Sequence, residues 1–402
     1  MSSSLVPTIA AADTRTRPRW PLGALSVEQF MRHHWQRRAA LFRQALPGID
    51  APLPLPELLM LAERDDVESR LISAFGGRWR LQHGPLDASA VPPLTRRRWT
   101  LLVQGVDGHD DRAHALLERF RFVPDARLDD LMISVASDGG GVGPHVDSYD
   151  VFLVQVWGRR RWRVGPPRPH ALVPGLPLKV LADFEAVQEF VLEPGDMLYL
   201  PPGWAHDGIA EGSCMTCSVG FRAPSRHEFL SAWLADAADQ IDGADPRFSD
   251  RRRAVAQRPA ELPSDLHRQL ADWARDWRPS SRQLDAFIGR FLTEPKPQVW
   301  FETADTTPSA QSFARLAGRA GLRLDRRSRA VYRGRRLFLN GESFEADAAA
   351  MRWLRQLADH RRLPADTARQ ALAHPLCAEL LRQWCIDGWL HVEERARLSE
   401  VC

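Results

Sequence analysis

The sequence predicts an α+β protein with an antiparallel β barrel or sandwich, then a helical stretch, then a small mixed C-terminal domain. Three observations predict this class. Short apolar runs separated by Gly and Pro fill residues 128–221, and apolar positions recur at helical spacing after Pro224. A Pro-Lys-Pro segment at 295–297, a candidate linker, then precedes alternating strand and helix patterns. Strands at this spacing without long intervening helices are typical of antiparallel sandwiches and barrels.

Bulk composition is that of a globular protein with more than one domain. The chain has 402 residues, of which 44% are hydrophobic and 26% charged, and its net charge is +3. No run of eighteen apolar residues occurs, so we expect no membrane span. Residues 1–19 lack the apolar core of a secretory signal, and we expect them to form a flexible N-terminus.

Cysteine usage favours a reducing compartment. The five cysteines are an odd number scattered over a long chain, which is no disulfide framework and points to the cytoplasm. Only Cys214 and Cys217 form a CxxC pair, and no second pair completes a zinc site. We therefore interpret both residues as buried strand positions rather than redox groups.

The N-terminal part contains two predicted helices and one strand. Ser26 and Gln29 have the spacing of a capping box, which predicts a helix from Ser26 onward. A second helix is expected near Pro56, because proline suits a first helical turn. The apolar run 99–104 predicts a strand.

Six further strands are expected in the barrel region, at 131–135, 151–157, 160–164, 190–192, 197–200 and 217–221. Gly158-Arg159 separates two of these runs and predicts a hairpin turn. The glycines between 139 and 143 predict a flexible approach to Pro144 and His145.

The C-terminal half changes to helical periodicity. Trp233, Trp273 and Trp277 lie on helical stretches and suit either internal packing or a homodimer surface. Residues 331–338 predict a strand that enters a tight hairpin at Asn340-Gly341. Helices at 346–357 and 367–384 and a strand at 389–392 complete a pattern that resembles a winged helix.

His145, Asp147 and His206 form a candidate metal site. Residues i and i+2 of an extended segment point to one face, so His145 and Asp147 can bind one ion together. His206 follows a Gly195-Asp196 turn and a short strand, and a barrel would return it beside them. Two imidazoles and one carboxylate form the facial triad of non-haem iron(II) oxygenases, which leaves positions open for an oxo-acid and dioxygen.

Arg160 strengthens this interpretation. If the predicted hairpin forms, Arg160 faces the same cavity as the triad, and a guanidinium binds a carboxylate bidentately. It therefore suits the distal carboxylate of 2-oxoglutarate. The adjacent Arg159, Arg161 and Arg163 are interpreted as surface charges.

Several motifs lie within a block of about 99–224: Leu131-Met132-Ile133-Ser134 and the runs at 139–150, 158–165, 192–196 and 218–224. Together they resemble bacterial JmjC-type ribosomal oxygenases, in particular the arginine 3-hydroxylases of large-subunit ribosomal protein L sixteen. The resemblance implies a double-stranded β-helix (cupin/JmjC barrel) at 20–225, a helical dimerisation segment at 226–294 and a winged-helix-like domain at 298–402. It also implies iron(II) on His145, Asp147 and His206 and 2-oxoglutarate on Arg160, with O2 as co-substrate.

Two departures from the family pattern stand at Arg38-Ala39-Ala40 and Thr216-Cys217. The first concerns packing. The second is expected to alter a wall of the cofactor or substrate pocket.

An arginine substrate needs an acidic partner and an apolar sleeve for its stem. Asp130, Met132 and Ser134 share one strand face by alternation. We expect Asp130 to bind the guanidinium and Met132 to line the stem, with Tyr149 as an aromatic wall and Ser218 as a hydrogen-bonding group. A loop carboxylate is the plain alternative for Asp130.

The expected function is hydroxylation of an arginine of ribosomal protein L sixteen by a cytoplasmic, homodimeric enzyme. A histidyl hydroxylase and an N-methyl demethylase use the same apparatus and remain alternatives. So does a non-enzymatic cupin whose basic cluster reads nucleic acid; that cluster is Arg323, Arg326, Arg327, Arg329, Arg333, Arg335 and Arg336. Because the net charge is modest, an exposed arginine-rich strand is favoured, and neither direct nucleic-acid binding nor a membrane partner is expected.

Overall fold

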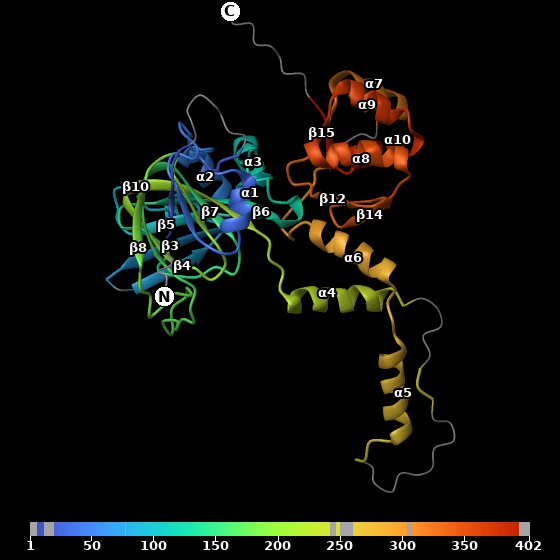
Figure 1. The fold of residues 1–402 in the computed structure, drawn as a ribbon, viewed down its shortest axis with the longest axis horizontal. Helices are drawn as coiled ribbons and strands as arrows, with labels where there is room; N and C mark the ends of the chain where they lie inside the picture. The colour runs from blue at the N-terminus through green and yellow to red at the C-terminus, as the bar shows by residue number, and fades with distance from the viewer. Residues whose placement is uncertain are drawn as a thin grey trace, which may run out of the picture.

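The computed structural model describes residues 6–11, 20–76, 78–241, 247–249, 260–303 and 308–393. A β barrel with three covering helices occupies the N-terminal half, and a smaller α/β domain occupies the C-terminal end (Figure 1). Helices α4 (Arg226–Asp239), α5 (Ser264–Asp276) and α6 (Ser281–Thr293) connect the two domains in sequence. Among the described residues, no helix is long and apolar enough to cross a membrane.

The barrel is one ten-stranded sheet within the described part of the chain. Its order is β1-β2-β9-β7-β10-β6-β5-β3-β4, and β8 also pairs with β7. The strands are β1 (Thr8–Ile9), β2 (Ala40–Phe42), β3 (Ser69–Phe75), β4 (Arg78–His83), β5 (Trp99–Val103), β6 (Leu128–Ala136), β7 (Val151–Gly165), β8 (Gln188–Leu192), β9 (Met197–Leu200) and β10 (Ala205–Phe221).

The N-terminal segment is attached to this sheet, unlike the flexible terminus that we expected over residues 1–19. Residues 1–5 and 12–19 lie outside the described residues. Within 6–11, β1 pairs in parallel with β2, and Val6 and Ile9 are buried. Burial of these apolar side chains stabilises the segment on the sheet.

Helices α1 (Val27–His33), α2 (Leu55–Ala62) and α3 (Asp111–Glu118) cover the outer face of the barrel. The predicted capping box at α1 is present, with Ser26 and Gln29 each bonding the other's backbone amide. Phe30 on α1 packs on Phe152 and Tyr199, with ring centroids 5.6 and 5.0 Å apart. This aromatic core fixes the outer face of β7 and β9, so their inner residues face the cavity.

The hairpin that we predicted at Gly158-Arg159 does not form. Residues 151–165 are one strand, β7, and both its halves pair antiparallel with the long strand β10. Gly158 has φ +64° and the register shifts in β10 nearby, so the position is a bulge. A bulge adds one residue to the strand. Odd-numbered residues such as Val151 and Leu153 therefore face the cavity before it, and even-numbered ones such as Arg160 and Trp162 face the cavity after it. The bulge, rather than a turn, directs Arg160 inward.

The C-terminal domain is a winged helix with two small sheets. It contains α7 (Ala310–Ala320), β11 (Leu322–Leu324), β12 (Ala330–Arg333), β13 (Arg336–Leu339), β14 (Glu342–Glu345), α8 (Ala348–His360), β15 (Arg362–Leu363), α9 (Ala365–Leu372), α10 (Pro375–Ile386) and β16 (Leu390–Val392). β15-β11-β16 form one sheet and β12-β13-β14 the other. The turn predicted at Asn340-Gly341 joins β13 to β14, and both residues have positive φ.

Two predicted elements of this domain are each divided in two. The strand expected at 331–338 is broken at Gly334, whose φ of +58° allows a tight turn between β12 and β13. The helix expected at 367–384 is α9 and α10, because Pro375 cannot continue a helix and instead starts α10. Helix α6 also packs on this domain: Gly289 lies against Phe338, and the Gly341 amide donates to Thr293.

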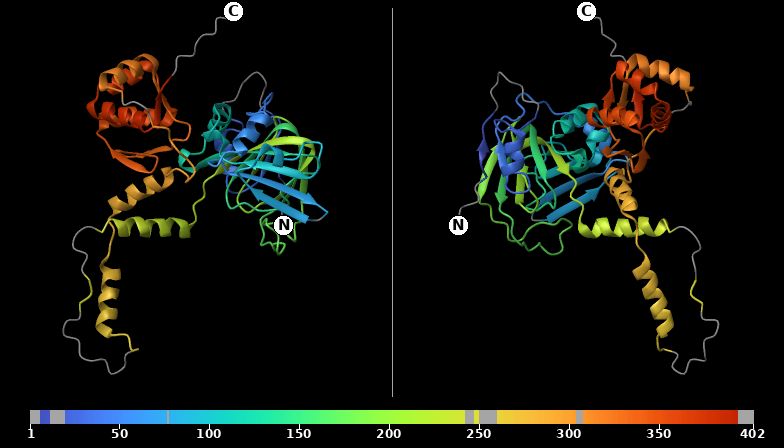
Figure 2. Two further views of the ribbon diagram at one scale, coloured as in Figure 1. Left: turned by 180° about the vertical axis from the view of Figure 1, so that it is seen from behind. Right: turned by 45° about the vertical axis from the view of Figure 1, so that its right-hand side comes forward.

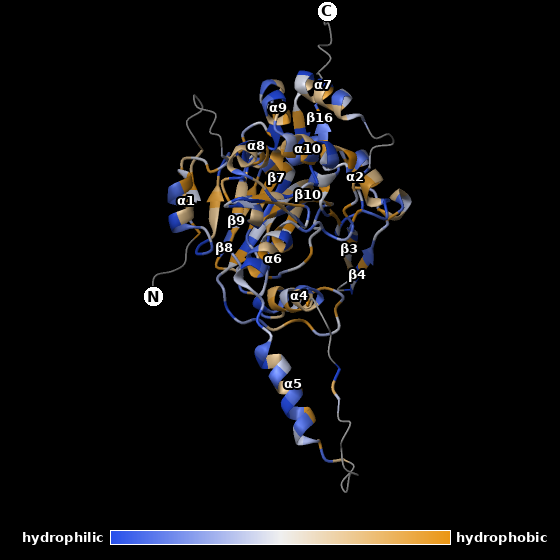
Figure 3. Cartoon of the chain, turned by 90° about the vertical axis from the view of Figure 1, so that its right-hand side faces the viewer, coloured by the Kyte–Doolittle hydropathy of each residue, from blue (hydrophilic) through white to orange (hydrophobic). Residues whose placement is uncertain are grey.

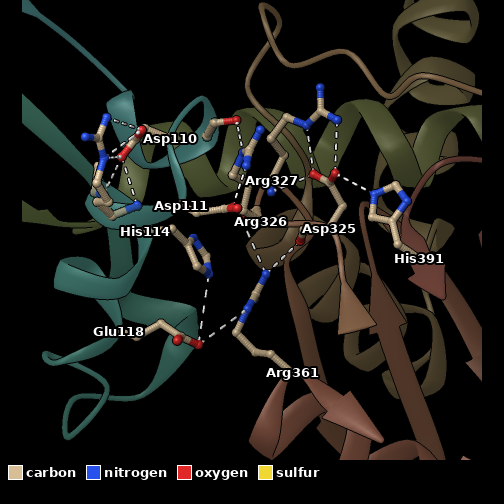
Figure 4. A network of polar contacts seen from close by, with 12 residues as sticks. Asp110, Asp111, His114, Glu118, Asp325, Arg326, Arg327, Arg361 and His391 are labelled. Carbon is tan, nitrogen blue, oxygen red and sulfur yellow. Dashed lines mark hydrogen bonds and ion pairs between the residues drawn. The ribbon is translucent and has the colours of Figure 1, made fainter. Parts of the chain in front are cut away.

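Ion pairs connect the barrel to the winged helix (Figure 4). Arg326 contacts Asp111 at 2.5 Å, and Arg361 lies 3.9 Å from Glu118 on α3. Arg327 is held by Asp325 within the domain. Arg326, Arg327 and Arg329 of the predicted basic cluster are thus ion-paired within the molecule, whereas we had favoured an exposed strand. Two further views show that α5 extends away from the rest of the chain (Figure 2).

Candidate metal centre

The three predicted metal ligands lie together at one end of the barrel. Each of His145, Asp147 and His206 offers one ligand atom, and these atoms lie within 4.8 Å of one another. The His206 Nε2 is 3.6 Å from one carboxylate oxygen of Asp147, and the His145 Nε2 is 4.0 Å from the other. His206 lies on β10. His145 is not the end of a regular strand but an isolated bridge residue opposite His206.

Backbone carbonyls orient both imidazoles. The Nδ1 of His145 lies 3.0 Å from the Gly143 carbonyl, and the Nδ1 of His206 lies 2.9 Å from the Trp204 carbonyl. A carbonyl can only accept, so each Nδ1 carries the proton and each Nε2 has a free lone pair. Burial, with the nearby His145, lowers the pKa of His206 to about 4. The neutral ring that a metal ligand requires is therefore its ordinary state.

The loop before His145 is tightly packed, in contrast to the flexible approach that we expected. Gly143 has φ +79°, and a Cβ there would lie 3.1 Å from Trp79 and 3.2 Å from Val180. A Cβ on Gly141 would lie 2.5 Å from the Gly208 carbonyl oxygen. The glycines are thus needed for close approach, which fixes the loop that carries the ligands.

Arg160 lies in the same cavity as the triad, which has a volume of about 470 Å³. It is buried, and its Nη1 donates to Ser134 Oγ at 3.0 Å and to Thr216 Oγ1 at 3.3 Å. The Thr216 hydroxyl in turn donates to Gln155 at 2.9 Å. Arg159, Arg161 and Arg163, which are close to Arg160 in sequence, point outward from β7. They pair with acidic side chains, as predicted for surface charges.

The donors in this cavity fit the proposed ligands. Among the described residues, Arg160 Nε and Thr100 Oγ1 are buried without a hydrogen-bond partner. Both line the cavity beside His206, and a carboxylate would satisfy both. Two imidazoles and one carboxylate suit iron(II) and leave three positions of an octahedral ion open. The residues present therefore fit a divalent ion together with a dicarboxylate.

The predicted substrate residues line the same cavity. Asp130, Met132 and Ser134 face it from β6, and Ser218 faces it from β10, paired in register with Met132. Tyr149 is half-exposed at its side. Strand alternation predicted the shared face of Asp130, Met132 and Ser134.

Sequence reasoning missed two groups that hold Asp130. Gln104 Nε2 donates to both oxygens of the Asp130 carboxylate, at 3.0 and 2.9 Å. Lys296 donates to Asp130 at 2.7 Å, although we had assigned this residue only to a linker. Thr216 had been noted as a departure from the family pattern, and it proves to be a direct partner of Arg160.

The CxxC pair is structural. Cys214 and Cys217 are buried on β10, and burial raises the pKa of the Cys217 thiol well above its ordinary range. A thiol that stays protonated is a poor nucleophile.

Comparisons with known proteins agree with this geometry. Residues 115–229 match the JmjC domain, residues 268–391 the ROXA-like winged helix, and residues 186–292 the AraC-like ligand binding domain. The chain is 33% identical over 383 residues to the ribosomal protein uL16 3-hydroxylase of Escherichia coli, covering 92% of this chain and 98% of that protein. It is 36% identical over 205 residues to a probable ribosomal oxygenase of Haemophilus influenzae, covering 50% of each.

A solved structure gives the same picture. The ribosomal oxygenase YcfD from Escherichia coli, in complex with cobalt and 2-oxoglutarate, superposes with a TM-score of 0.78 at 31% sequence identity. The match covers 92% of this chain and 99% of that one.

Proposed function

This chain belongs to the family of JmjC ribosomal oxygenases, and we propose that it hydroxylates an arginine of ribosomal protein uL16 in the cytoplasm. It is a 2-oxoglutarate-dependent oxygenase that uses iron(II) and O2. The proposed substrate is supported by the 33% identity, over nearly the whole chain, to a uL16 3-hydroxylase. The observation that carries the chemistry is the common cavity of the triad, Arg160 and Asp130.

Each side chain has a distinct proposed task. His145, Asp147 and His206 would hold iron(II), and Arg160 with Thr100 would hold the far carboxylate of 2-oxoglutarate. Bound iron(II) supplies the oxidation of a C–H bond, coupled to conversion of 2-oxoglutarate and O2 into succinate and carbon dioxide. Asp130 would bind the substrate guanidinium, while Met132 and Tyr149 would enclose its stem and exclude water.

Strand β6 of the barrel helps to orient both reactants. Arg160 is held by β6 and β10 through Ser134 and Thr216, and Asp130 lies on the same β6 strand. Rigid strands hold a geometry better than loops do, which favours a fixed distance between the oxidant and the substrate carbon.

Mass spectrometry tests this proposal directly. Purified protein with iron(II), 2-oxoglutarate and ascorbate would be incubated with a uL16 peptide, and His145→Ala would serve as the control. We expect a gain of one oxygen on an arginine that disappears in the variant. A gain on histidine, or loss of a methyl group from an N-methylated residue, would instead identify one of the alternative activities. Triad-dependent succinate without peptide modification would keep the enzyme class and reject this substrate.

We also propose a homodimer formed through the helical segment. Trp233 is buried against Phe287 within the chain, so it serves internal packing. Helix α5 instead has no buried residue and projects from the rest of the chain (Figure 3). Leu270 and Trp273 on this helix are exposed. An amphipathic helix without an internal partner is best stabilised by a second copy.

Light scattering would test the dimer. We expect wild-type protein at micromolar concentration to have twice the mass of the chain and Trp273→Glu to reduce it. Met60→Glu, at an exposed apolar position on α2, is the matched control and should leave the mass unchanged. A monomeric wild-type protein would contradict the proposal.

A further inference from the structure

Lysine is almost absent from this chain. Lys and Arg together number 54, and only Lys179 and Lys296 are lysines, so the other 52 (54 − 2) are arginines. Both lysines lie near the active site: Lys179 lines the cavity, and Lys296 binds Asp130. Because nearly every other basic residue is arginine, the effect of arginine at position 296 bears on the role of Lys296.

Lys296 engages two adjacent carboxylates. Its Nζ lies 2.7 Å from Asp130 and 3.1 Å from Asp129, and Asp130 is only 6% exposed. Burial alone would raise the pKa of Asp129, but Lys296 and Arg329 outweigh burial and hold that pKa below its ordinary range. The acidic end of the substrate pocket is therefore already occupied by a cation of the chain itself.

Asp129 and Asp130 are already matched in number by cations, and the neighbouring Asp107 is buried, with its pKa raised to about 7 by burial and by Asp130. Asp129 and Asp130 face two cations, Lys296 and Arg329, the latter 3.2 Å from Asp129. A substrate guanidinium would add a third positive charge to this partly buried site. Such an excess is unfavourable where water screens poorly, so binding of the substrate favours departure of one resident cation.

Of the two cations, Lys296 is better placed to leave. Asp129, Asp130 and Gln104 line both the active-site cavity and a cleft between barrel and winged helix, whereas Lys296 lines only the cleft. Its ammonium thus reaches the carboxylates from behind the pocket, and the side chain remains 30% exposed. Arg329, in contrast, also donates to the Asp129 backbone carbonyl at 2.7 Å and is anchored in the winged helix.

We propose that Lys296 is an internal competitor that the substrate must displace from Asp130, and that this exchange makes the pocket select arginine over lysine. The inference rests on the proposed function, because it names a residue that sets the specificity of the same pocket. A guanidinium forms a planar fork that binds both oxygens of a carboxylate, whereas an ammonium is a point charge. A substrate lysine would replace one ammonium by another and gain nothing, but arginine gains the second bond.

The competitor must be weaker than the substrate for this exchange to work. An arginine at position 296 would hold Asp130 with the same fork that the substrate offers. Lysine therefore suits the role in a chain that otherwise uses arginine almost throughout. Selectivity of this kind comes from a repulsive or competing element as well as from attraction to the right ligand.

Binding measurements on two variants test the exchange. Protein loaded with iron(II) and 2-oxoglutarate under nitrogen would be titrated with a uL16 peptide and with the same peptide carrying lysine at the target position. Lys296→Met should tighten binding of the arginine peptide by about three- to tenfold. It should tighten binding of the lysine peptide by more, so the preference for arginine over lysine falls. Lys296→Arg keeps the positive charge and should weaken binding of the arginine peptide by a similar factor.

A purely structural role of Lys296 predicts different changes in peptide affinity. If Lys296 only positions Asp130, Lys296→Met weakens binding of the arginine peptide, while the affinity of Lys296→Arg for this peptide stays close to that of the wild type. That pattern would overturn the inference. Because Lys296→Arg preserves the charge balance, it remains informative even if Lys296→Met fails to fold.

A second measurement observes the displacement itself. Reductive dimethylation with ¹³C-formaldehyde and a borane reductant gives NMR signals for Lys179, Lys296 and any free N-terminal amine, and the arginine variant of each lysine assigns them. N-acetyl-arginine methylamide and the uL16 peptide should both move the Lys296 signal to that of a free lysine. A peptide that fails to bind while the amide displaces Lys296 would reject the uL16 substrate alone. Binding of either ligand without a change at Lys296, or displacement by neither, would overturn the exchange.

Discussion

The backbone amide of His145 donates to the carbonyl of His206, and the amide of His206 donates back to the carbonyl of His145, both at 2.9 Å. The two imidazole rings then face each other with centroids 4.2 Å apart. This reciprocal bridge joins the glycine-rich loop to the start of β10. The metal site is therefore preorganised by backbone bonds, and its weak points lie in the loop that supports them.

Gly143→Ala should damage the metal site more than the fold. Its φ of +79° disfavours alanine, the new Cβ would press on Trp79, and its carbonyl orients His145. We expect metal affinity to fall by about tenfold, as for the loss of other groups that orient a ligand. Gly175→Ala is the matched control, because Gly175 has φ +72° with open space around it. Cobalt titration followed by absorption would compare the variants, and equal affinities would contradict the assigned role of the loop.

Thr216→Val should weaken 2-oxoglutarate binding. Valine keeps the shape of threonine but removes the acceptor for Arg160 and the donor to Gln155. Leaving these buried groups unpaired costs about 1–1.5 kcal/mol, which corresponds to a five- to tenfold higher KM for 2-oxoglutarate. Succinate formation at varied 2-oxoglutarate would measure it. Thr216→Ser should restore a KM near wild type, and an unchanged KM in the valine variant would exclude Thr216 from the cofactor pocket.

Features that depend on a few neighbouring residues were predictable from the sequence. The capping box at Ser26, the turn at Asn340-Gly341 and the inward face of Asp130, Met132 and Ser134 follow from local spacing, and the structure confirms them. The HxD pair also needs only the alternation of an extended chain. Local geometry decides these positions, so no knowledge of distant partners is required.

Features that depend on pairing partners were not predictable. The first part of β10, from Ala205, is polar and glycine-containing and forms a strand because β7 lies beside it. The edge strand β4 has only two partly buried apolar residues, Trp79 and Leu81, and this alternation is too short to predict a strand. The bulge at Gly158 and the contact of Lys296 with Asp130 arise only when segments far apart in sequence meet. Lysine's rarity was the one signal that could have singled out Lys296.

Asp107→Asn should stabilise the protein in a pH-dependent way. Burial, together with the charge of Asp130, raises the pKa of Asp107 to about 7, above its ordinary value of 3.8. The folded state therefore binds more protons between these values, and the stability contributed by Asp107 falls as pH rises from about 4 to 7. Asparagine can still accept the Leu131 amide, which lies 2.8 Å from Asp107.

Thermal unfolding would measure this effect. The variant should be more stable than wild type by about 1–3 kcal/mol at pH 8, with the difference vanishing towards pH 4. A constant difference across that range would show that titration of Asp107 is not its cause.

Asp130→Asn should separate substrate binding from oxidation. Asparagine keeps the size of the side chain and one acceptor for Gln104, but it removes the charge that would attract a guanidinium. Loss of a charged partner in a desolvated pocket costs about 2–3 kcal/mol or more, so arginine-peptide hydroxylation should fall by a factor of thirty or more. Arg160 and Thr216 are unchanged, so 2-oxoglutarate turnover without peptide should persist. Parallel assays of modified peptide and of succinate would measure the ratio. If both activities fall equally, Asp130 acts on the whole site rather than on the substrate, because only a group that touches the peptide can uncouple the two.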